Sequence, residues 1–427
     1  MADIKKIAVI GLGYVGLPLA VHLAKHFPVI GLDIDANRVD EIKRGHDRTR
    51  EIDRLQLCDT TMKFANDPAV IAGSDIYIVT VPTPVDNNNL PDLTAVRGAS
   101  RMVGGVIKKG AIIVYESTVY PGVTEDIAGP ELEAASGLKC GEDFFLGYSP
   151  ERINPGDREH TVDKITKVVA GQTPEVTQIL GDIYAKLTSG GVFLARDIKT
   201  AEAAKVIENA QRDINIAFVN EVATIFQKMG LSVYDVLEAA GTKWNFLKFS
   251  PGLVGGHCIG VDPFYLAHVA TMIGHHPEII LAGRRINDNM GGYVADCIAL
   301  ELAKRGKGAG ARILMLGLTF KENVPDLRNS HVIDIVRGLT GRGFGVEIHD
   351  AFADPAEAQE FFDVSLLPSI DDATGYDCVV GAVPHQPYVA FTPEKFSTLL
   401  TDDGLVADVK GMWRDHALPG NLFRWQL

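Results

Sequence analysis

The sequence predicts an α/β fold in which two doubly wound parallel sheets are joined by a helical segment. Three observations support this fold class. Short apolar runs alternate with helix-like stretches near both ends of the chain, as they do in parallel sheets covered by helices. Between them, residues 198–229 contain no Gly or Pro and predict one long helix. The apolar runs that open the two ends resemble one another, and each pair of runs ends in an aspartate, Asp33 or Asp350.

The first region begins as a strand–helix–strand unit. Residues 6–10 form an apolar run that ends at Gly11, residues 14–26 are helix-like, and a second strand ends at Asp33. Further strand-like runs lie at residues 76–81, 111–115 and 143–148. This alternation predicts a parallel, doubly wound domain over residues 1–196.

The remainder of the chain divides into a helical part and a second alternating part. Helical patterns at residues 198–229 and 277–305 enclose a segment rich in Gly and Pro, residues 248–264, where we expect a loop. Strand-like runs return at residues 313–318, 345–349, 378–383 and 405–409. We therefore expect a central helical domain over residues 197–307 and a second Rossmann-like domain over residues 308–427.

Length, charge and cysteine usage exclude several classes of protein. The 427 residues are enough for roughly three domains. Acidic side chains outnumber basic ones by 55 to 41, and this net charge of −14 argues against a surface that binds nucleic acid or anionic lipid. The five cysteines are scattered and form no Cys-x-x-Cys pair, which favours a reducing, cytoplasmic setting. No apolar span predicts a membrane anchor, and His275 with His276 lacks a third ligand at metal spacing, so we assign no metal.

The first glycine-rich loop has the spacing of a dinucleotide-binding fingerprint. Gly11, Gly13 and Gly16 lie between a predicted strand and a predicted helix, where glycines permit a tight turn and a close approach of the backbone to a pyrophosphate. The loop residues Tyr14 and Val15 are therefore expected to contact the cofactor as well.

Two further residues refine this expected cofactor site. Asp33 ends the second strand, where its carboxylate would bind a ribose 2′-hydroxyl and repel a 2′-phosphate, which favours NAD over NADP. Arg38 is either a residue that stacks near the adenine or a solvated charge on a helix.

Polar residues also follow three later strands. Thr83, Thr118 and the pair Glu151 and Arg152 each come after an apolar run, so they belong to the carboxyl edge of the sheet, where ligands bind. The threonines would touch the cofactor, and Glu151 would act as a general acid or base or would position water. The alternatives are simple turns and an exposed loop carboxylate.

The central region carries the remaining candidates for chemistry. Lys205, Asn209 and Arg212 share one helix face, where a lysine stabilises an oxyanion and an asparagine orients a hydroxyl or water. The alternative is a polar stripe in solvent. Cys258 lies among glycines with Asp262 four residues later, and we expect its thiolate to attack an aldehyde. The alternative is a small buried cysteine.

The second alternating region lacks the glycine fingerprint, so we expect no second dinucleotide there. The segment after its first strand carries Lys321 and Arg328, which could contact phosphates.

Taken together, the chain resembles the UDP-sugar 6-dehydrogenase family over residues 1 to about 420. The motifs that carry the resemblance are GLGYVG, VPTP, ESTVYPG, SPERINPG, the Lys205 and Asn209 pair, GGHCIGVD and GLTFKENVPDLRNS. The resemblance implies an N-terminal NAD domain, a helical middle that forms a homodimer, and a C-terminal domain that holds UDP.

The resemblance also implies a four-electron oxidation of the sugar C6 hydroxyl to a carboxylate. Cys258 would capture the intermediate aldehyde as a thiohemiacetal and then carry a thioester that water hydrolyses. Lys205 would stabilise oxyanions, and Asn209 and Glu151 would position substrate or water. Thr118 with Asp262 would hold a water for proton transfer.

The same resemblance assigns the binding residues. The residues implied to contact the UDP-sugar are Glu151, Arg152, Lys205, Asn209, Gly255, Gly256, Phe320 and Lys321, with Lys410 a weaker candidate. Arg328 would contact the nicotinamide cofactor.

Residues 241–266 resemble the branch that acts on UDP-N-acetylhexosamines for surface polysaccharide, which implies UDP-GlcNAc or UDP-GalNAc as substrate. UDP-glucose or UDP-ManNAc are the alternatives within the family. A two-electron dehydrogenase that does not need Cys258, and a non-catalytic NAD-responsive regulator, are the alternatives outside it.

Overall fold

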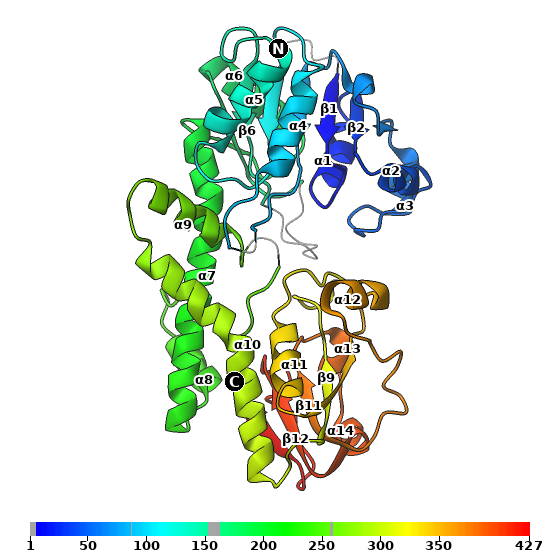
Figure 1. Ribbon diagram of the computed structural model, residues 1–427, viewed down its shortest axis with the longest axis vertical. Helices are drawn as coiled ribbons and strands as arrows, with labels where there is room; N and C mark the ends of the chain where they lie inside the picture. The colour runs from blue at the N-terminus through cyan, green and yellow to red at the C-terminus, as the bar shows by residue number, and fades with distance from the viewer. Residues whose placement is uncertain (1–5, 87, 153–162, 257–258) are drawn as a thin grey trace. The chain divides into compact units, whose positions relative to one another are not determined.

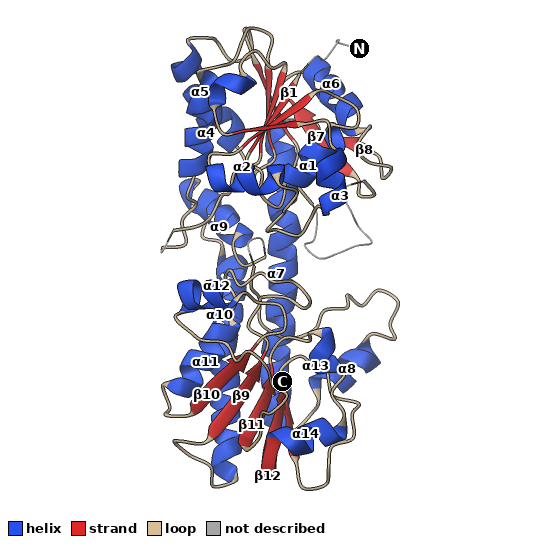
Figure 2. Cartoon of the chain, turned by 90° about the vertical axis from the view of Figure 1, so that its right-hand side faces the viewer, coloured by secondary structure: helices blue, strands red, loops and turns tan. Residues whose placement is uncertain are grey.

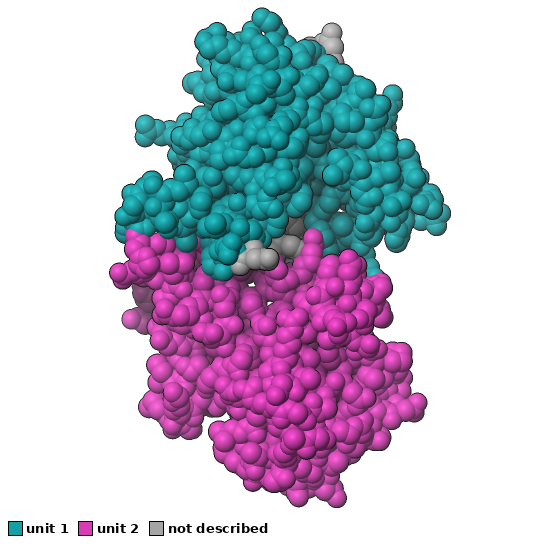
Figure 3. Space-filling model, viewed as in Figure 1, with its two compact units in different colours: residues 1–208, 264–275 teal, residues 209–263, 276–427 magenta. Residues whose placement is uncertain are grey.

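The computed structural model describes residues 6–86, 88–152, 163–256 and 259–427. These residues form two compact units, coloured separately in Figure 3. The first unit comprises residues 1–208 with 264–275, and the second comprises residues 209–263 with 276–427. The long helix α7 (Ile198–Met229) contributes to both, so the division into three segments at 196 and 307 stays a prediction.

The first unit is built on an eight-stranded sheet with the order β3-β2-β1-β4-β5-β6-β7-β8. Its strands are β1 (Ile7–Ile10), β2 (Val29–Leu32), β3 (Lys63–Ala65), β4 (Ile76–Val79), β5 (Ile112–Tyr115), β6 (Phe145–Tyr148), β7 (Lys167–Gly171) and β8 (Val192–Leu194). Central strands such as β1 and β4 are buried along their whole length, as expected for a sheet covered on both faces.

Two strands of this sheet, β7 and β8, run against the others. β6 and β7 pair antiparallel, with Gly147 opposite Gly171 and Tyr148 opposite Ala170, so the expectation of a wholly parallel sheet is wrong at this pair.

Helices cover both faces of the first sheet. Figure 2 shows α4 (Thr94–Gly104) and α5 (Gly129–Ser136) on one side, with α1 (Gly16–Leu23) and α6 (Pro174–Tyr184) on the other. The apolar faces of α1 and α6 share one buried cluster with β1, β4 and β5. The unit also contains α2 (Ala36–Lys43), α3 (Arg54–Asp59), the short turns η1 (Pro68–Ile71) and η2 (Val123–Ala128), and most of α9 (Asp262–Met272).

The second unit contains a five-stranded parallel sheet with the order β10-β9-β11-β12-β13. The strands are β9 (Arg312–Leu316), β10 (Gly345–His349), β11 (Tyr376–Gly381), β12 (Leu400–Asp408) and β13 (Phe423–Gln426). Alternate residues of β9 face two different cores: Ile313 and Met315 lie in one, and Leu314 and Leu316 in the other. Both faces of this sheet are therefore buried.

The helices of the second unit supply those two cores (Figure 1). α10 (Glu278–Lys304) and α11 (Val332–Thr340) pack in the first, and α13 (Gln386–Val389) and α14 (Pro393–Leu399) in the second. The remaining helices are α8 (Val233–Ala240) and α12 (Pro355–Phe362). The α/β fold class with two doubly wound sheets and a long helix is thus confirmed, apart from the direction of β7 and β8.

The loop predicted at residues 248–264 is shorter than expected. α9 already begins at Asp262, so the prediction is wrong for the last three residues. Pro263 is compatible with this start, because the first turn of a helix needs no backbone N–H from a proline. None of the helices within the described ranges is both long and apolar enough to cross a membrane.

Candidate active site

The glycine-rich loop after β1 has the backbone that a dinucleotide requires. Gly11 has φ +92°, a conformation that side chains rarely adopt. A Cβ at Gly16 would lie 1.8 Å from the Gly11 carbonyl oxygen, whereas a Cβ at Gly13 would meet nothing within 4 Å. Tyr14 and Val15 form the turn between them and lead directly into α1. The loop is therefore closed on its inner side and open at Gly13, which suits the close approach of a pyrophosphate.

Asp33 and Arg38 are both tied to this loop. The Asp33 carboxylate accepts hydrogen bonds from the backbone N–H of Leu12 at 2.7 Å and of Asp35 at 2.9 Å. Arg38 is 4% exposed, and its Nε donates to the Leu12 carbonyl at 2.9 Å while its Nη2 contacts Asp47 at 2.6 Å. Its Nη1 is buried and has no hydrogen-bond partner among the described residues. Arg38 is not a solvated helix charge, and its Nη1 offers a donor to a bound oxygen; stacking on adenine stays a prediction.

The loops after β4 and β5 are held together at the carboxyl edge of the sheet. The Thr83 hydroxyl donates to the Thr118 carbonyl at 2.7 Å, and the Tyr265 hydroxyl donates to the Thr83 carbonyl at 2.7 Å. Beyond them, the Glu202 carboxylate accepts from the backbone N–H groups of Gly122 at 2.6 Å and Thr124 at 2.9 Å. These bonds bring the two predicted threonine loops into one place, and cofactor contact by either threonine stays a prediction.

Glu151 follows β6 and is 8% exposed, so it is not an exposed loop carboxylate. Its Oε1 accepts the backbone N–H of Arg152 at 2.6 Å, and its Oε2 lies 3.2 Å from the ammonium of Lys167. Arg152 in turn pairs with Glu208 on α7 at 2.7 Å. Lys167 and its second partner Glu116 were not predicted from the sequence as site residues. A lysine at the start of an apolar strand was a visible signal for Lys167.

Two of the three polar residues that were predicted to be functional on α7 are buried. Lys205 is 7% and Asn209 6% exposed, whereas Arg212 is exposed. The Asn209 side-chain amide donates to Asp262, which is buried at the start of α9. The solvent-stripe alternative therefore fails for Lys205 and Asn209.

The predicted nucleophile Cys258 and its neighbour His257 lie outside the described residues, so the role of Cys258 stays a prediction. Thr118 lies in the first unit and Asp262 in the second, and their shared water also stays a prediction. Within the described ranges, no group of three or more His, Cys, Asp or Glu side chains could hold a metal.

The second unit contains a pocket that includes three of the residues predicted to bind substrate. It is lined by Leu253, Gly255, Thr319, Phe320, Lys321, Glu322, Ser330, His331, Val332, Ala382, Val383, Pro384 and Lys410. A Cβ at Gly255 would lie 2.6 Å from the Asn329 carbonyl oxygen, and one at Gly256 would lie 2.7 Å from the Phe320 ring. The two glycines therefore let the segment that precedes Cys258 pack directly against Phe320.

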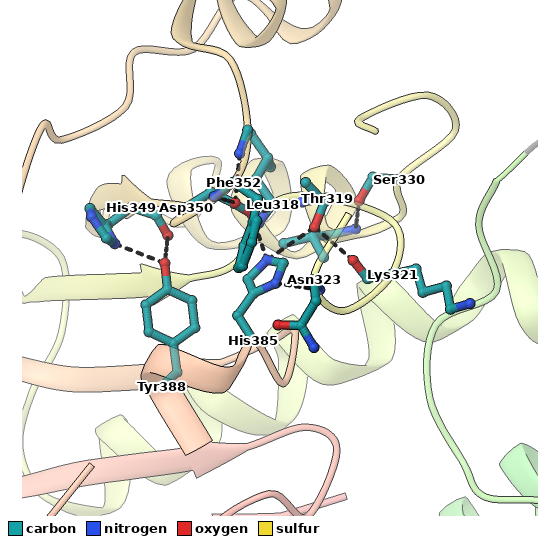
Figure 4. Close-up of polar contacts among 12 residues, drawn as sticks. Leu318, Thr319, Lys321, Asn323, Ser330, His349, Asp350, Phe352, His385 and Tyr388 are labelled. Carbon is teal, nitrogen blue, oxygen red and sulfur yellow. Dashed lines mark hydrogen bonds and ion pairs between the residues drawn. The ribbon is translucent and has the colours of Figure 1, made fainter. Parts of the chain in front are cut away.

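A buried polar network holds the loop that carries Phe320 and Lys321 (Figure 4). Asp350, at the end of β10, accepts from the backbone N–H groups of Leu318 at 2.6 Å and Thr319 at 3.0 Å. Burial raises the pKa of Asp350, but His385 and the backbone donors outweigh it and lower the pKa overall.

His385 links this aspartate to the far side of the same loop. Its Nδ1 accepts the backbone N–H of Asn323 at 2.9 Å, so the ring proton lies on Nε2, which is 3.1 Å from the Asp350 carboxylate. Both ends of the loop are thus fixed to one pair of side chains. His385 was not predicted from the sequence, because the spacing of a single histidine does not indicate whether its side chain is buried.

Arg328 lies in the same unit, and its side chain pairs with a residue close to it in the sequence. Its guanidinium forms two hydrogen bonds to Asp326, at 3.0 and 2.9 Å. Contact with the cofactor therefore stays a prediction.

Comparison with protein families gives three matches in chain order. All three belong to the UDP-glucose/GDP-mannose dehydrogenase family: the NAD binding domain matches residues 5–188, the central domain residues 199–289, and the UDP binding domain residues 314–415. The glycine loop lies in the first match and the pocket of Phe320 and Lys321 in the third.

Individual relatives extend over almost the whole chain. Protein CapL of Staphylococcus aureus is 51% identical over 99% of this chain and 100% of its own length. UDP-N-acetyl-D-glucosamine 6-dehydrogenase of Pseudomonas aeruginosa is 48% identical over 96% of this chain and 97% of its own. The solved structure of UDP-D-ManNAc dehydrogenase from Pyrococcus horikoshii has a TM-score of 0.89 at 30% identity and covers 98% of both chains.

Proposed function

Because the chain belongs to the UDP-glucose/GDP-mannose dehydrogenase family, we propose that it is an NAD-dependent UDP-N-acetyl-D-glucosamine 6-dehydrogenase. One observation of the structure carries the proposal: Gly255 and Gly256, just before Cys258, pack against Phe320 in the nucleotide-sugar pocket. This packing supports a role for the glycine-rich segment in binding the sugar nucleotide.

The proposed reaction converts an alcohol, a water and two NAD into a carboxylate, two NADH and three protons. NAD, when bound, would supply the oxidising power by taking one hydride from C6 of the sugar in each of the two oxidations. Between the two oxidations, the Cys258 thiol adds to the aldehyde, and after the second it is joined to C6 as a thioester. Water then adds to C6, the C6–S bond breaks, and the thiolate is released.

The described side chains have separate tasks in this scheme. Lys205, buried on α7, would stabilise the oxygen of C6 when it becomes negative, and Asn209 would orient the hydroxyl while Asp262 holds its amide. Glu151 would position the hydrolytic water and accept its proton. Lys321, with Lys410, would meet the charge of the UDP phosphates at the pocket.

We also propose that the enzyme is a cytoplasmic homodimer. A reducing compartment suits a reaction that depends on a free thiol. α7 exposes three large apolar side chains at spacings of seven and four residues, hence on one face: Phe218 (60% exposed), Ile225 (49%) and Met229 (62%). A second copy of this face would cover them, as apolar side chains are covered in homodimer interfaces.

The test is to incubate the pure protein with NAD and UDP-GlcNAc, UDP-GalNAc, UDP-ManNAc or UDP-glucose, and to count the NADH formed per sugar. We expect two NADH and a uronic acid from UDP-GlcNAc, and no release of uronic acid by Cys258→Ala. One NADH per sugar would show a two-electron dehydrogenase, and NAD binding without turnover on any sugar would show a regulator. Activity on UDP-glucose alone would contradict the substrate and leave the chemistry intact.

A further inference from the structure

A charged cluster is buried behind Glu151 in the first unit. The side chains of Lys167 and Glu116 are 0% exposed, and that of Glu151 is 9% exposed. The Lys167 ammonium lies 3.1 Å from a Glu116 oxygen and 3.2 Å from a Glu151 oxygen. The hydroxyl of the buried Tyr184, on α6, donates to the other oxygen of Glu116.

The reversed direction of β7 explains how a lysine reaches this place. In a wholly parallel sheet, the first residue of a strand lies at the amino edge, away from the ligand. β7 runs antiparallel to β6, and continuing their register beyond Tyr148 and Ala170 brings Lys167 opposite position 151. The first residue of β7 therefore lies at the carboxyl edge, beside the residues that follow β5 and β6.

The cluster contains two carboxylates and one ammonium. Burial works against the charge of Lys167, but Glu116 and Glu151 outweigh it and raise the pKa of the ammonium. Burial raises the pKa of Glu116, and Lys167 only partly offsets this. Glu116 is thus hard to ionise in this buried place, and the ammonium of Lys167 bridges the two carboxyl groups.

Two other groups near Glu151 cannot take over the contact that Lys167 makes with its carboxylate. Arg152 gives its backbone N–H to the second oxygen of Glu151, while its guanidinium pairs with Glu208. Tyr184 is neutral, because burial raises its pKa well above the ordinary value. Lys167 and the Arg152 backbone hold one oxygen each and so fix the plane of the carboxylate.

We propose that Lys167, held by Glu116 and Tyr184, is a positioning residue that holds the Glu151 carboxylate in place and aims it at the hydrolytic water. The proposal rests on the proposed function, in which Glu151 takes a proton from that water. The water oxygen then bonds to C6, the C6–S bond breaks with its electrons on sulfur, and the new carboxylic acid loses the second water proton to solvent.

The experiment measures the pH profile of kcat, the KM for NAD and the burst of NADH for the full-length protein with UDP-GlcNAc. Lys167→Met should lower kcat roughly 10- to 100-fold, the size expected for a misplaced catalytic group, with KM for NAD unchanged. The mass spectrum of the quenched protein should then show an acyl adduct on Cys258. Lys167→Arg should restore at least a third of the wild-type kcat, because a guanidinium also donates to two carboxylates.

Glu116→Gln provides a second variant if Lys167→Met fails to fold. Removing the competing charge leaves Lys167 to Glu151 alone, so the acidic limb of kcat should move down by about half a pH unit, or about threefold in rate on that limb. Lys139→Met, which breaks an exposed ion pair with Glu142, is the matched control and should leave the profile unchanged.

Two outcomes distinguish a failure of this inference from a failure of the proposed function. Wild-type kcat and pH profile in both Lys167→Met and Glu116→Gln, with Glu151→Gln inactive, would overturn the role of Lys167 and leave Glu151 in place. Wild-type turnover by Glu151→Gln would instead overturn the role of Glu151 in the proposed function.

Discussion

Gly256 shows how a single residue makes room for Phe320, which lines the pocket of the second unit. Its φ of +84° and the 2.7 Å between a Cβ built on it and the Phe320 ring mean that any side chain would displace that ring. The spacing of the glycines indicated a close approach of backbone and substrate. The structure adds that Phe320 is the group they make room for.

We expect Gly256→Ala to weaken binding of UDP about tenfold or more, because the ring must leave its place in the pocket. Isothermal titration with UDP measures this loss. Gly306→Ala is the matched control: Gly306 has a similar φ of +70° but nothing within 4 Å of its Cβ position. Equal loss of affinity in the two variants would show that backbone strain, and not Phe320, is responsible.

Glu202 gives a prediction on stability against pH. Burial raises its pKa to about 7, despite hydrogen bonds from Thr124 and Gly122. The folded chain therefore binds this proton more tightly than the unfolded chain does. The contribution of Glu202 is most favourable below its ordinary value of 4.5 and is lost as the pH rises to about 7, on the order of 3 kcal/mol.

Glu202→Gln removes this titration. We expect the Tm of the wild type, measured relative to that of Glu202→Gln, to fall between pH 5 and pH 8. A difference in Tm that stays constant over this range would show that Glu202 does not titrate there.

At the scale of elements, the positions of helices and strands along the chain were easier to predict from the sequence than the pairing of the strands. The long helix was predicted at its observed bounds because no Gly or Pro interrupts it. Neither β7 nor its direction was predicted, since a short apolar run does not indicate the direction in which it pairs. Burial of the charge on Lys167 depends on that direction, and for this reason the cluster with Glu116 could not be predicted from spacing.

The loop between β9 and α11 is held in place by hydrogen bonds to one histidine, His385. We expect His385→Phe to weaken UDP binding about tenfold, because it removes the acceptor for the Asn323 N–H and the donor to Asp350. His385→Asn should recover part of this affinity if its side-chain oxygen accepts the Asn323 N–H. UDP and NAD titrations of the two variants check this.

The NAD titration is the internal control for the histidine variants. The network lies wholly in the second unit and the glycine loop in the first, so NAD affinity should stay at the wild-type value. Unchanged UDP affinity in His385→Phe would contradict the role given to this histidine.

For the whole molecule, the prediction concerns assembly. We expect Phe218→Glu with Ile225→Glu to convert a dimer to a monomer of about half the mass, because a charged face cannot be buried against its own copy. Light scattering after size-exclusion chromatography measures the mass. Arg212→Glu, also exposed on α7, is the control and should remain dimeric.

α7 has a mechanical consequence for Lys205 and Asn209, the two residues proposed to act on the sugar. The boundary between the two compact units falls after Glu208, so Lys205 belongs to one and Asn209 to the other. Both lie on successive turns of one unbroken helix, which separates their backbones by about 6 Å. Because the helix is unbroken, α7 itself sets the spacing of these two residues, whichever unit each belongs to.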